Sequence, residues 1–266
     1  MSFASPTPKL RVEIEGGVGR LLIDNASRRN AIDFEMWRAL PEIARALDDD
    51  PDVRVVMLRA APGLSFCSGA DISEFSTVRA SAEGGRAYEA ANLEAFDALA
   101  QMSKPTVAAI GGFCMGGGMG LAASCDLRIA REDAVFAIPA ARLGVGYPPA
   151  AMAYVTSAVG VQTAMEMFFT ARRLDAREAL ARGFVAQLAP NDGFEDAVTA
   201  LAKTIAANAP LTLRAAKAAI RAATGAPHAP SAEQCDALAT LCFDSADFEE
   251  GRSAFLEKRA PKFTGR

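Results

Sequence analysis

The sequence contains very little histidine. His228 is the only one among 266 residues, and it lies between Pro227 and Pro230 in a segment of small residues. A serine or cysteine nucleophile is usually activated by a histidine that accepts its proton, so this scarcity disfavours hydrolytic mechanisms of that kind. We interpret His228 as a loop residue and look for the chemistry elsewhere.

Disulfide and metal chemistry is not indicated either. The five cysteines are an odd number and show neither C-x-x-C nor metal-ligand spacing. We therefore expect reduced, mostly buried thiols, with Cys67 and Cys114 as inert packing residues, and no metal site. The sequence also lacks a charged-then-apolar leader and any apolar run near the roughly 18 residues of a membrane span. These absences predict a cytoplasmic protein without a membrane partner.

An excess of positive charge is missing as well. Lysine and arginine number 28 against 32 aspartates and glutamates, and the sequence pI is near 5.2, which argues against a nucleic-acid partner. With 51% hydrophobic and 23% charged residues, the composition is that of an ordinary globular protein. The length suits one sizeable domain, alone or with a small helical appendage.

The most informative segment runs from Ser103 to Ala130. It holds an apolar strand pattern, a glycine-dense turn, a short helical pattern and a second strand pattern. The glycines of the turn are Gly111, Gly112, Gly116, Gly117 and Gly118. Such a turn exposes bare N–H groups, and the start of a helix favours an oxyanion there. The glycines do not form G-x-G-x-x-G, so a dinucleotide is disfavoured, whereas a role in close helix packing stays open.

A second strand-to-turn motif lies earlier, at Phe66-Cys67-Ser68-Gly69-Ala70-Asp71-Ile72. This motif, the glycine turn and Cys125-Asp126-Leu127-Arg128-Ile129-Ala130 together strongly resemble the enoyl-CoA hydratase/isomerase family, the crotonase superfamily. Arg29-Asn30-Ala31-Ile32, residues 136–146 and residues 250–259 extend the resemblance over nearly the whole chain. It implies an α/β fold, a crotonase-type spiral of ββα units with a helical C-terminal region. It also implies a core over residues 1–200 with an acyl-CoA site, and a trimerisation region over residues 201–266.

By this resemblance, the backbone amides of Ala70 and Gly117 form an oxyanion hole for a thioester enolate. Preorganised amide donors of this kind supply on the order of several kcal/mol of transition-state stabilisation. The resemblance further implies coenzyme A as the carrier group of the substrate, and a homotrimer or a dimer of trimers.

The resemblance also implies which segments hold coenzyme A. They are represented by Arg28, Arg29, Ala31, Ser68, Ala70, Asp71, Ile72, Lys258 and Phe263. A guanidinium group matches the geometry of a phosphate, so the two arginines suit the nucleotide part of the cofactor. The alternatives are that the arginines and the basic chain end are solvated, and that Asp71 only fixes its turn.

The chain departs from the hydratase pattern at two positions. Hydratases of the resembled family carry glutamates where this sequence has Gly120 and Ala140, and the neighbouring residues are apolar. Hydration of an enoyl thioester needs a base for water and an acid for the α-carbon, so decarboxylation or another lyase reaction is favoured. Two alternatives remain: a hydratase or isomerase whose acid or base is Glu74, Glu83 or Glu89, and a non-catalytic acyl-CoA-binding protein.

Tyr147 is the remaining catalytic candidate. Its loop, Leu143-Gly144-Val145-Gly146-Tyr147-Pro148, resembles in register that of the superfamily's methylmalonyl-CoA decarboxylases. A phenol can orient a carboxylate or relay a proton to an enolate. The alternative is that Tyr147 only packs against the pocket, and those decarboxylases carry a histidine where this chain has Ala70.

Periodicity predicts the remaining elements. Two strands around Gly16-Gly17 form a hairpin, and apolar spacing gives a helix from Phe34 to Leu47 with Trp37 in the core. Gly84-Gly85 interrupts the pattern before a helix over about 86–102. The rest is predicted as helix over 150–170 and 174–181, a strand over 183–188, and helices over 195–207, 211–223, 232–243 and 246–258.

Overall fold

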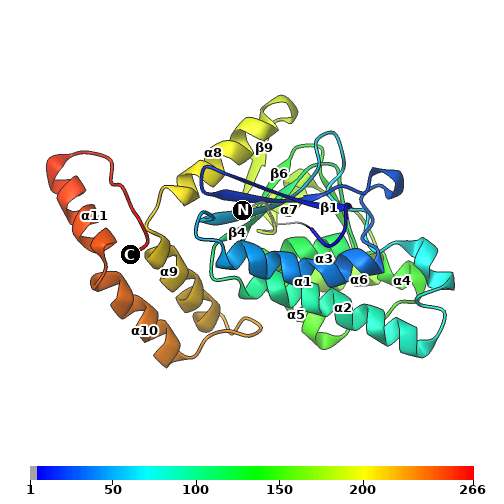
Figure 1. The fold of residues 1–266 in the computed structure, drawn as a ribbon. Helices are drawn as coiled ribbons and strands as arrows, with labels where there is room; N and C mark the ends of the chain where they lie inside the picture. The colour runs from blue at the N-terminus through cyan, green and yellow to red at the C-terminus, as the bar shows by residue number, and fades with distance from the viewer. Residues whose placement is uncertain (1–4) are drawn as a thin grey trace.

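The computed structural model describes residues 5–266, apart from the side chain of Phe75. Figure 1 shows a sheet with helices on both faces and a helical arm that leaves the body near the C-terminus. The strands are β1 (Leu10–Glu15), β2 (Val18–Ile23), β3 (Val55–Ala60), β4 (Thr106–Ile110), β5 (Phe113–Met115), β6 (Leu127–Arg131), β7 (Val135–Ala137), β8 (Leu174–Asp175) and β9 (Gln187–Ala189). The longer helices are α1 (Phe34–Asp49), α2 (Ala82–Gln101), α3 (Gly117–Ser124), α5 (Pro149–Val159), α6 (Val161–Thr170), α8 (Phe194–Ala206), α9 (Pro210–Ala223), α10 (Ala232–Phe243) and α11 (Ala246–Glu257).

Short helices complete the chain: η1 (Ala26–Arg28), η2 (Ile72–Ser76), α4 (Ala140–Leu143), α7 (Ala176–Ala181) and η3 (Asn191–Gly193). Among the described residues, no helix combines the length and hydropathy that crossing a membrane requires. The five cysteines are free thiols, and Cys67, Cys114 and Cys125 are buried.

The strands form two sheets that the chain visits in turn. The larger has the order β1-β2-β3-β4-β6-β9, with β1 and β2 antiparallel and the later pairs parallel. The smaller has the order β5-β7-β8, and a bridge between Cys67 and Cys114 continues it. Three successive circuits place one segment in each sheet before a helix: β3 with the bridged segment at Cys67, β4 with β5, and β6 with β7. The predicted α/β spiral of ββα units is therefore confirmed.

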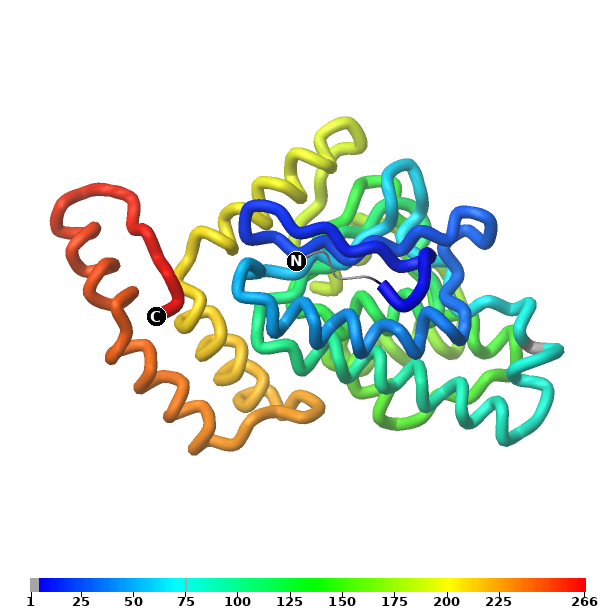
Figure 2. The backbone as a smooth tube through the Cα atoms, viewed as in Figure 1, coloured from blue at the N-terminus to red at the C-terminus, as the bar shows by residue number. Residues whose placement is uncertain are grey.

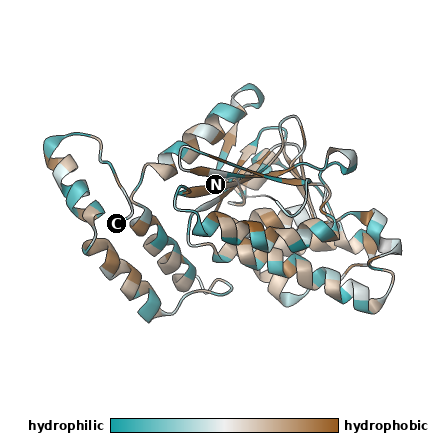
Figure 3. Cartoon of the chain, viewed as in Figure 1, coloured by the Kyte–Doolittle hydropathy of each residue, from teal (hydrophilic) through white to brown (hydrophobic). Residues whose placement is uncertain are grey.

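The two faces of the larger sheet pack against different helices. Along β3, Val56 and Leu58 lie in the main core with α1 and α2, whereas Val55 and Met57 face α8. This alternation is the two-residue period of a strand buried on both sides. In Figure 3 the strands are accordingly brown along most of their length. Trp37 is fully buried, as predicted.

Four of the predicted element boundaries are wrong. The second helix begins at Ala82 and runs through Gly84, because the carbonyl of Val78 lies where a Cβ would be and Ser81 caps the Gly84 amide at 3.0 Å. Gly160, with φ +78°, divides the expected helix over 150–170 into α5 and α6. Residues 174–175 are a short strand rather than the start of a helix.

The fourth correction concerns residues 183–188. Their first part continues the turn after α7, since the amides of Phe184 and Val185 both donate to the carbonyl of Ala179. Only Gln187–Ala189 pairs with β6. The strand therefore starts four residues later than the apolar pattern indicated.

The C-terminal region is helical, as predicted. α8 packs on the sheet through Phe194, Val198 and Ala202, so the expected division near residue 200 falls inside a core helix. α9, α10 and α11 follow as an arm beside the body, which the tube of Figure 2 traces from yellow to red. Large apolar side chains on this arm are exposed, among them Phe243, Phe255 and Leu256. The role of this region in trimerisation stays a prediction.

Candidate active site

The two motifs singled out in the sequence lie side by side. The amide of Cys67 donates to the carbonyl of Phe113 at 2.8 Å, and the amide of Met115 donates to the carbonyl of Cys67 at 2.9 Å. Gly69 has φ +107°, and a Cβ there would lie 3.2 Å from the carbonyl oxygen of Met115. Glycine is therefore needed at this position for both its backbone conformation and its close contact.

The amides of Ala70 and Gly117 lie close to each other. A Cβ built on Gly117 would lie 3.8 Å from the nitrogen of Ala70 and 2.9 Å from the Trp37 indole. Within residues 5–266, neither amide donates a hydrogen bond to another group. Two neighbouring N–H groups without an acceptor, held by backbone, can receive one oxyanion. The structure thus brings the two predicted donors together.

The packing behind these amides is tight. The Cβ of Cys67 lies 2.8 Å from where a Cβ on Gly118 would be, so Cys67 fills the space that this glycine leaves. Burial raises the pKa of the Cys67 thiol to about 12. A thiol that keeps its proton is a poor nucleophile, which agrees with the predicted packing role.

The predicted coenzyme A loop is joined to the same turn. The amide of Ile32 donates to the carbonyl of Gly69 at 2.8 Å, and the amide of Asp71 donates to the carbonyl of Ile32 at 2.9 Å. The hydroxyl of Ser68 donates to the carbonyl of Arg28 at 3.2 Å. These bonds hold the loop over residues 28–32 against the turn over residues 68–72. The two segments contain the predicted coenzyme A residues Arg28, Arg29, Ala31, Ser68, Ala70, Asp71 and Ile72.

The side chains of these two segments differ in exposure and in how firmly hydrogen bonds hold them. Asp71 accepts from the amide and hydroxyl of Ser73, at 2.9 and 2.7 Å, so it fixes its turn and is not free to act as a base. The Arg28 guanidinium is exposed and lies 3.8 Å from the Asp71 carboxylate. The side chain of Ile72 is 68% exposed, whereas Ala31 is buried.

Lys258 and Phe263 lie elsewhere in the same chain. Lys258 ends α11, and the carbonyl of Phe263 accepts a hydrogen bond from Arg54 at 2.8 Å. In Figure 1 α11 lies at the opposite end of the molecule from α4 and the loop after β2. Their role in holding coenzyme A stays a prediction.

Both positions where hydratases of the family carry a glutamate are buried. Gly120 is buried in α3, and a Cβ on it would overlap the phenyl ring of Phe96 on α2. Ala140 is buried at the start of α4. Phe96 could not be singled out from the sequence, because its contact with Gly120 forms only when α2 packs on α3.

Tyr147 lies beside the glycine turn. Its hydroxyl would be 3.8 Å from a Cβ on Gly116, the residue before the Gly117 donor. Its ring packs edge-on against Phe168, with ring centroids 5.2 Å apart. Burial raises the pKa of the Tyr147 phenol to about 12, and the charge of Glu89 adds to the shift. The residue therefore both packs and borders the site.

The three candidate glutamates have different environments. The carboxylate of Glu74 accepts from the amide of Phe34 at 2.9 Å, which ties it to the start of α1. Glu83 is exposed in the first turn of α2. Glu89 lies in a pocket of about 650 Å³ together with Arg79 and Tyr147. Of the three, only Glu89 lines the pocket that Tyr147 also lines.

Arg79 was not singled out in the sequence, although it is the partner of Glu89. Its guanidinium contacts the Glu89 carboxylate at 2.8 Å, with the two side chains 13% and 26% exposed. Burial raises the pKa of the Glu89 carboxyl above its ordinary value, and the Arg79 charge opposes this shift. No motif connects these residues, and their pairing follows from the chain path around η2.

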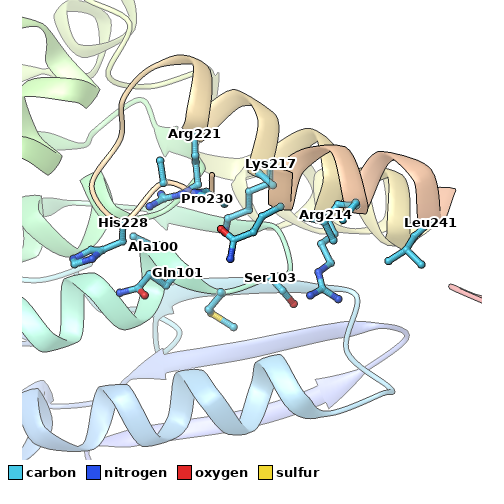
Figure 4. Close-up of a pocket in the computed structure, with 15 residues that line it drawn as sticks. Ala100, Gln101, Ser103, Arg214, Lys217, Arg221, His228, Pro230 and Leu241 are labelled. Atoms are coloured by element: carbon cyan, nitrogen blue, oxygen red, sulfur yellow. The ribbon is translucent and has the colours of Figure 1, made fainter. Parts of the chain in front are cut away.

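A second hollow, of about 470 Å³, lies between the end of α2, α9 and α10. Figure 4 shows Lys217 and Arg221 extending from α9 toward it, with His228 at one side. Lys217 is engaged by Asp126 at 2.7 Å, and His228 lies 3.3 Å from Asp97. None of the turn residues lines this hollow, and His228 is a loop residue as predicted.

The spiral of ββα units, with two acceptor-free amides where its glycine turns meet, defines a crotonase-type fold. A family model described as enoyl-CoA hydratase/isomerase matches residues 13–266. This chain therefore belongs to the enoyl-CoA hydratase/isomerase family, whose members act on acyl-CoA thioesters.

Individual relatives agree over nearly the full length. A probable enoyl-CoA hydratase of Mycobacterium leprae is 33% identical over 249 residues, covering 94% of this chain and 95% of that protein. The peroxisomal Delta(3,5)-Delta(2,4)-dienoyl-CoA isomerase of Arabidopsis thaliana is 30% identical and covers 96% and 95%. A crystal structure described as an enoyl-CoA hydratase/carnithine racemase, from Magnetospirillum magneticum, has 35% identity and a TM-score of 0.92 over 98% of this chain and 97% of its own.

Proposed function

We propose that this protein cleaves a carbon–carbon bond in an acyl-CoA thioester, and that the reaction is the decarboxylation of a malonyl-type thioester. One observation carries the proposal. The amides of Ala70 and Gly117 lie close together without acceptors, whereas the space beside Gly120 is filled by Phe96 and Ala140 is buried. A reaction that forms an enolate without a pair of carboxylates fits such a site.

In this reaction the bond between the α-carbon and the carboxylate breaks. Its electron pair enters the thioester, which becomes an enolate, and carbon dioxide leaves. The amides of Ala70 and Gly117 hold the enolate oxygen, and one donor of this kind is worth about 3–4 kcal/mol in comparable sites. A proton then adds to the α-carbon. Tyr147, beside Gly116, is positioned to orient the departing carboxylate or to relay this proton.

The charge of the pocket supports a carboxylated acyl group. Arg79 and Arg86 both line it, against the single carboxylate of Glu89. Among residues 5–266, Arg86 makes no ion pair. A guanidinium group near the acyl chain favours a substrate with a second negative charge.

A second candidate is isomerisation or hydration of an enoyl thioester with Glu89 as acid and base. The observation in its favour is that Glu89 alone, of the three candidate glutamates, lines the pocket that Tyr147 also lines. The names of the relatives also include both hydratases and an isomerase.

The test is mass spectrometry of enoyl- and malonyl-type thioesters after incubation with the protein in deuterated water. Decarboxylation predicts loss of carbon dioxide with one deuterium gained, and a lower rate in Tyr147→Phe. Gain of water or a shifted double bond would favour the second candidate. Thioesters that bind but return unchanged would contradict both and leave an acyl-CoA-binding protein.

The assembly and compartment are also proposals. We infer a homotrimer or a dimer of trimers, in which Lys258 and Phe263 of one subunit approach the coenzyme A of its neighbour. The exposed Phe243 and Phe255 of the helical arm support this assembly, because apolar surface of that kind is usually covered. The free thiols support a reducing compartment such as the cytoplasm.

A further inference from the structure

The inner face of α2 carries a polar group that no described contact satisfies. Asn92 is only 9% exposed, and its carbonyl oxygen Oδ1 is buried without a hydrogen-bond partner. Buried polar atoms are normally paired, so this acceptor is an exception that a water or a ligand group would complete. Asn92 lies one helical turn from Glu89.

Asn92 also connects Glu89 to the reaction site. Phe96, one further turn along α2, fills the space beside Gly120. The side chain of Asn92 hydrogen-bonds the Glu89 carboxylate. The three side chains therefore follow one face of α2, from the pocket to the place where hydratases of the family have a glutamate.

The other partners of Glu89 are fixed to the oxyanion turns. Arg79 lies over the Tyr88 ring at 4.7 Å, and the Tyr88 hydroxyl donates to the carbonyl of Ile32 at 3.1 Å. Ile32 in turn pairs with the turn that contains Ala70. Movement of the Glu89 carboxylate relative to the oxyanion donors is thus restricted by a chain of direct contacts.

We propose that Glu89 is the residue that transfers a proton to the α-carbon of the enolate, and that Asn92 and Arg79 position its carboxyl group. This inference rests on the proposed enolate chemistry, whichever reaction produces the enolate. The carboxyl O–H bond breaks as the new C–H bond forms, which leaves a carboxylate stabilised by Arg79 and Asn92. Solvent restores the proton through the open side of the pocket.

Glu89 suits this role better than Tyr147. A general acid works best when its pKa is near the working pH, and the buried phenol is held far above that range. Burial raises the pKa of the Glu89 carboxyl above its ordinary value, although the Arg79 charge and the Asn92 hydrogen bond oppose this shift. Tyr147 remains as a group that orients the substrate.

The experiment measures exchange of the α-protons of butyryl-CoA with deuterated water, which needs an enolate but no decarboxylation or hydration. We expect Glu89→Gln to lower the exchange rate at least 100-fold while the Kd for butyryl-CoA changes less than threefold. Glu94→Gln, an exposed glutamate on the same helix, is the matched control and keeps the wild-type rate. Asn92→Leu, of similar volume, should slow exchange about tenfold and shift its pH midpoint, which a purely structural role would not do.

The outcomes separate this inference from the proposed function. If Glu89→Gln loses the exchange, the proton-transfer role of Glu89 is supported. If the wild type leaves malonyl-type thioesters unchanged in the same experiment, decarboxylation is contradicted. If Glu89→Gln decarboxylates at the wild-type rate with the same stereospecific deuterium uptake, Glu89 is not the proton donor, whereas the proposed decarboxylation is supported. Exchange by Glu89→Gln within threefold of the wild type also overturns the assignment of Glu89, as does the absence of any exchange by the wild type.

Discussion

The contact between Gly120 and Phe96 gives a quantitative prediction. Gly120→Ala adds a methyl group that overlaps the Phe96 ring. Overpacking of a core costs about 1–3 kcal/mol, and the better helix propensity of alanine returns at most about 1 kcal/mol. We expect a net loss near 2 kcal/mol. Phe96→Ala alone should cost about 3–5 kcal/mol, because it leaves a cavity in the same place.

The double variant distinguishes this contact from a general weakness of α3. With the ring removed, the added methyl no longer overlaps anything, so Gly120→Ala/Phe96→Ala should be no less stable than Phe96→Ala. The coupling energy is then about 2 kcal/mol, well above the roughly 0.5 kcal/mol found for independent sites.

Urea unfolding at a fixed protein concentration measures all four proteins, and thermal scans should show Gly120→Ala about 4–8 °C below the wild type. If the two losses simply add, or if Gly120→Ala is as stable as the wild type, the ring does not fill this space and the main argument against a glutamate here fails.

Three further predictions concern the turns and the pocket. Gly117→Ala brings a Cβ to 2.9 Å from Trp37 and displaces an oxyanion donor, so turnover should fall at least 100-fold with little change in thioester Kd, measured by calorimetry. The pKa of Glu89 is raised in the folded state, so the stability that this carboxyl contributes is complete below its ordinary pKa of 4.5 and is lost as the pH rises through its folded-state pKa. Urea unfolding from pH 4 to 8 should show this decline in the wild type and not in Glu89→Gln. Arg28→Ala should weaken coenzyme A binding up to tenfold at low salt and less at high salt, and an effect independent of salt would contradict a phosphate contact.

The predictable part of the site lies in its backbone. The turn at Gly69 and the glycine turn are short, and their glycines report directly on tight conformations and close approaches. Their order along the chain then identified the family and, with it, the spiral. The resemblance also predicts the amides of Ala70 and Gly117 as oxyanion donors, and the structure places these two residues close together.

The unpredictable part lies in contacts between distant elements. Phe96 meets Gly120, and Arg79 meets Glu89, only after α2 packs across α1 and α3. No periodicity records such a meeting. The start of α2 was misplaced for a related reason, because Gly84 indicates a break by propensity but is required by the nearby Val78 carbonyl.

The hydrogen bonds that join Cys67, Phe113 and Met115 have a consequence for how such a protein changes its reaction. They hold the turn at Gly69 between the two sheets, and α2 supports this turn through the hydrogen bond from Tyr88 to the carbonyl of Ile32. We propose that substitutions on α2 that keep Tyr88 can alter which bond is made or broken while the pair of amides is inherited intact. A chimera that exchanges residues 89–101 with a relative, and so keeps Arg79 and Tyr88, would test this proposal.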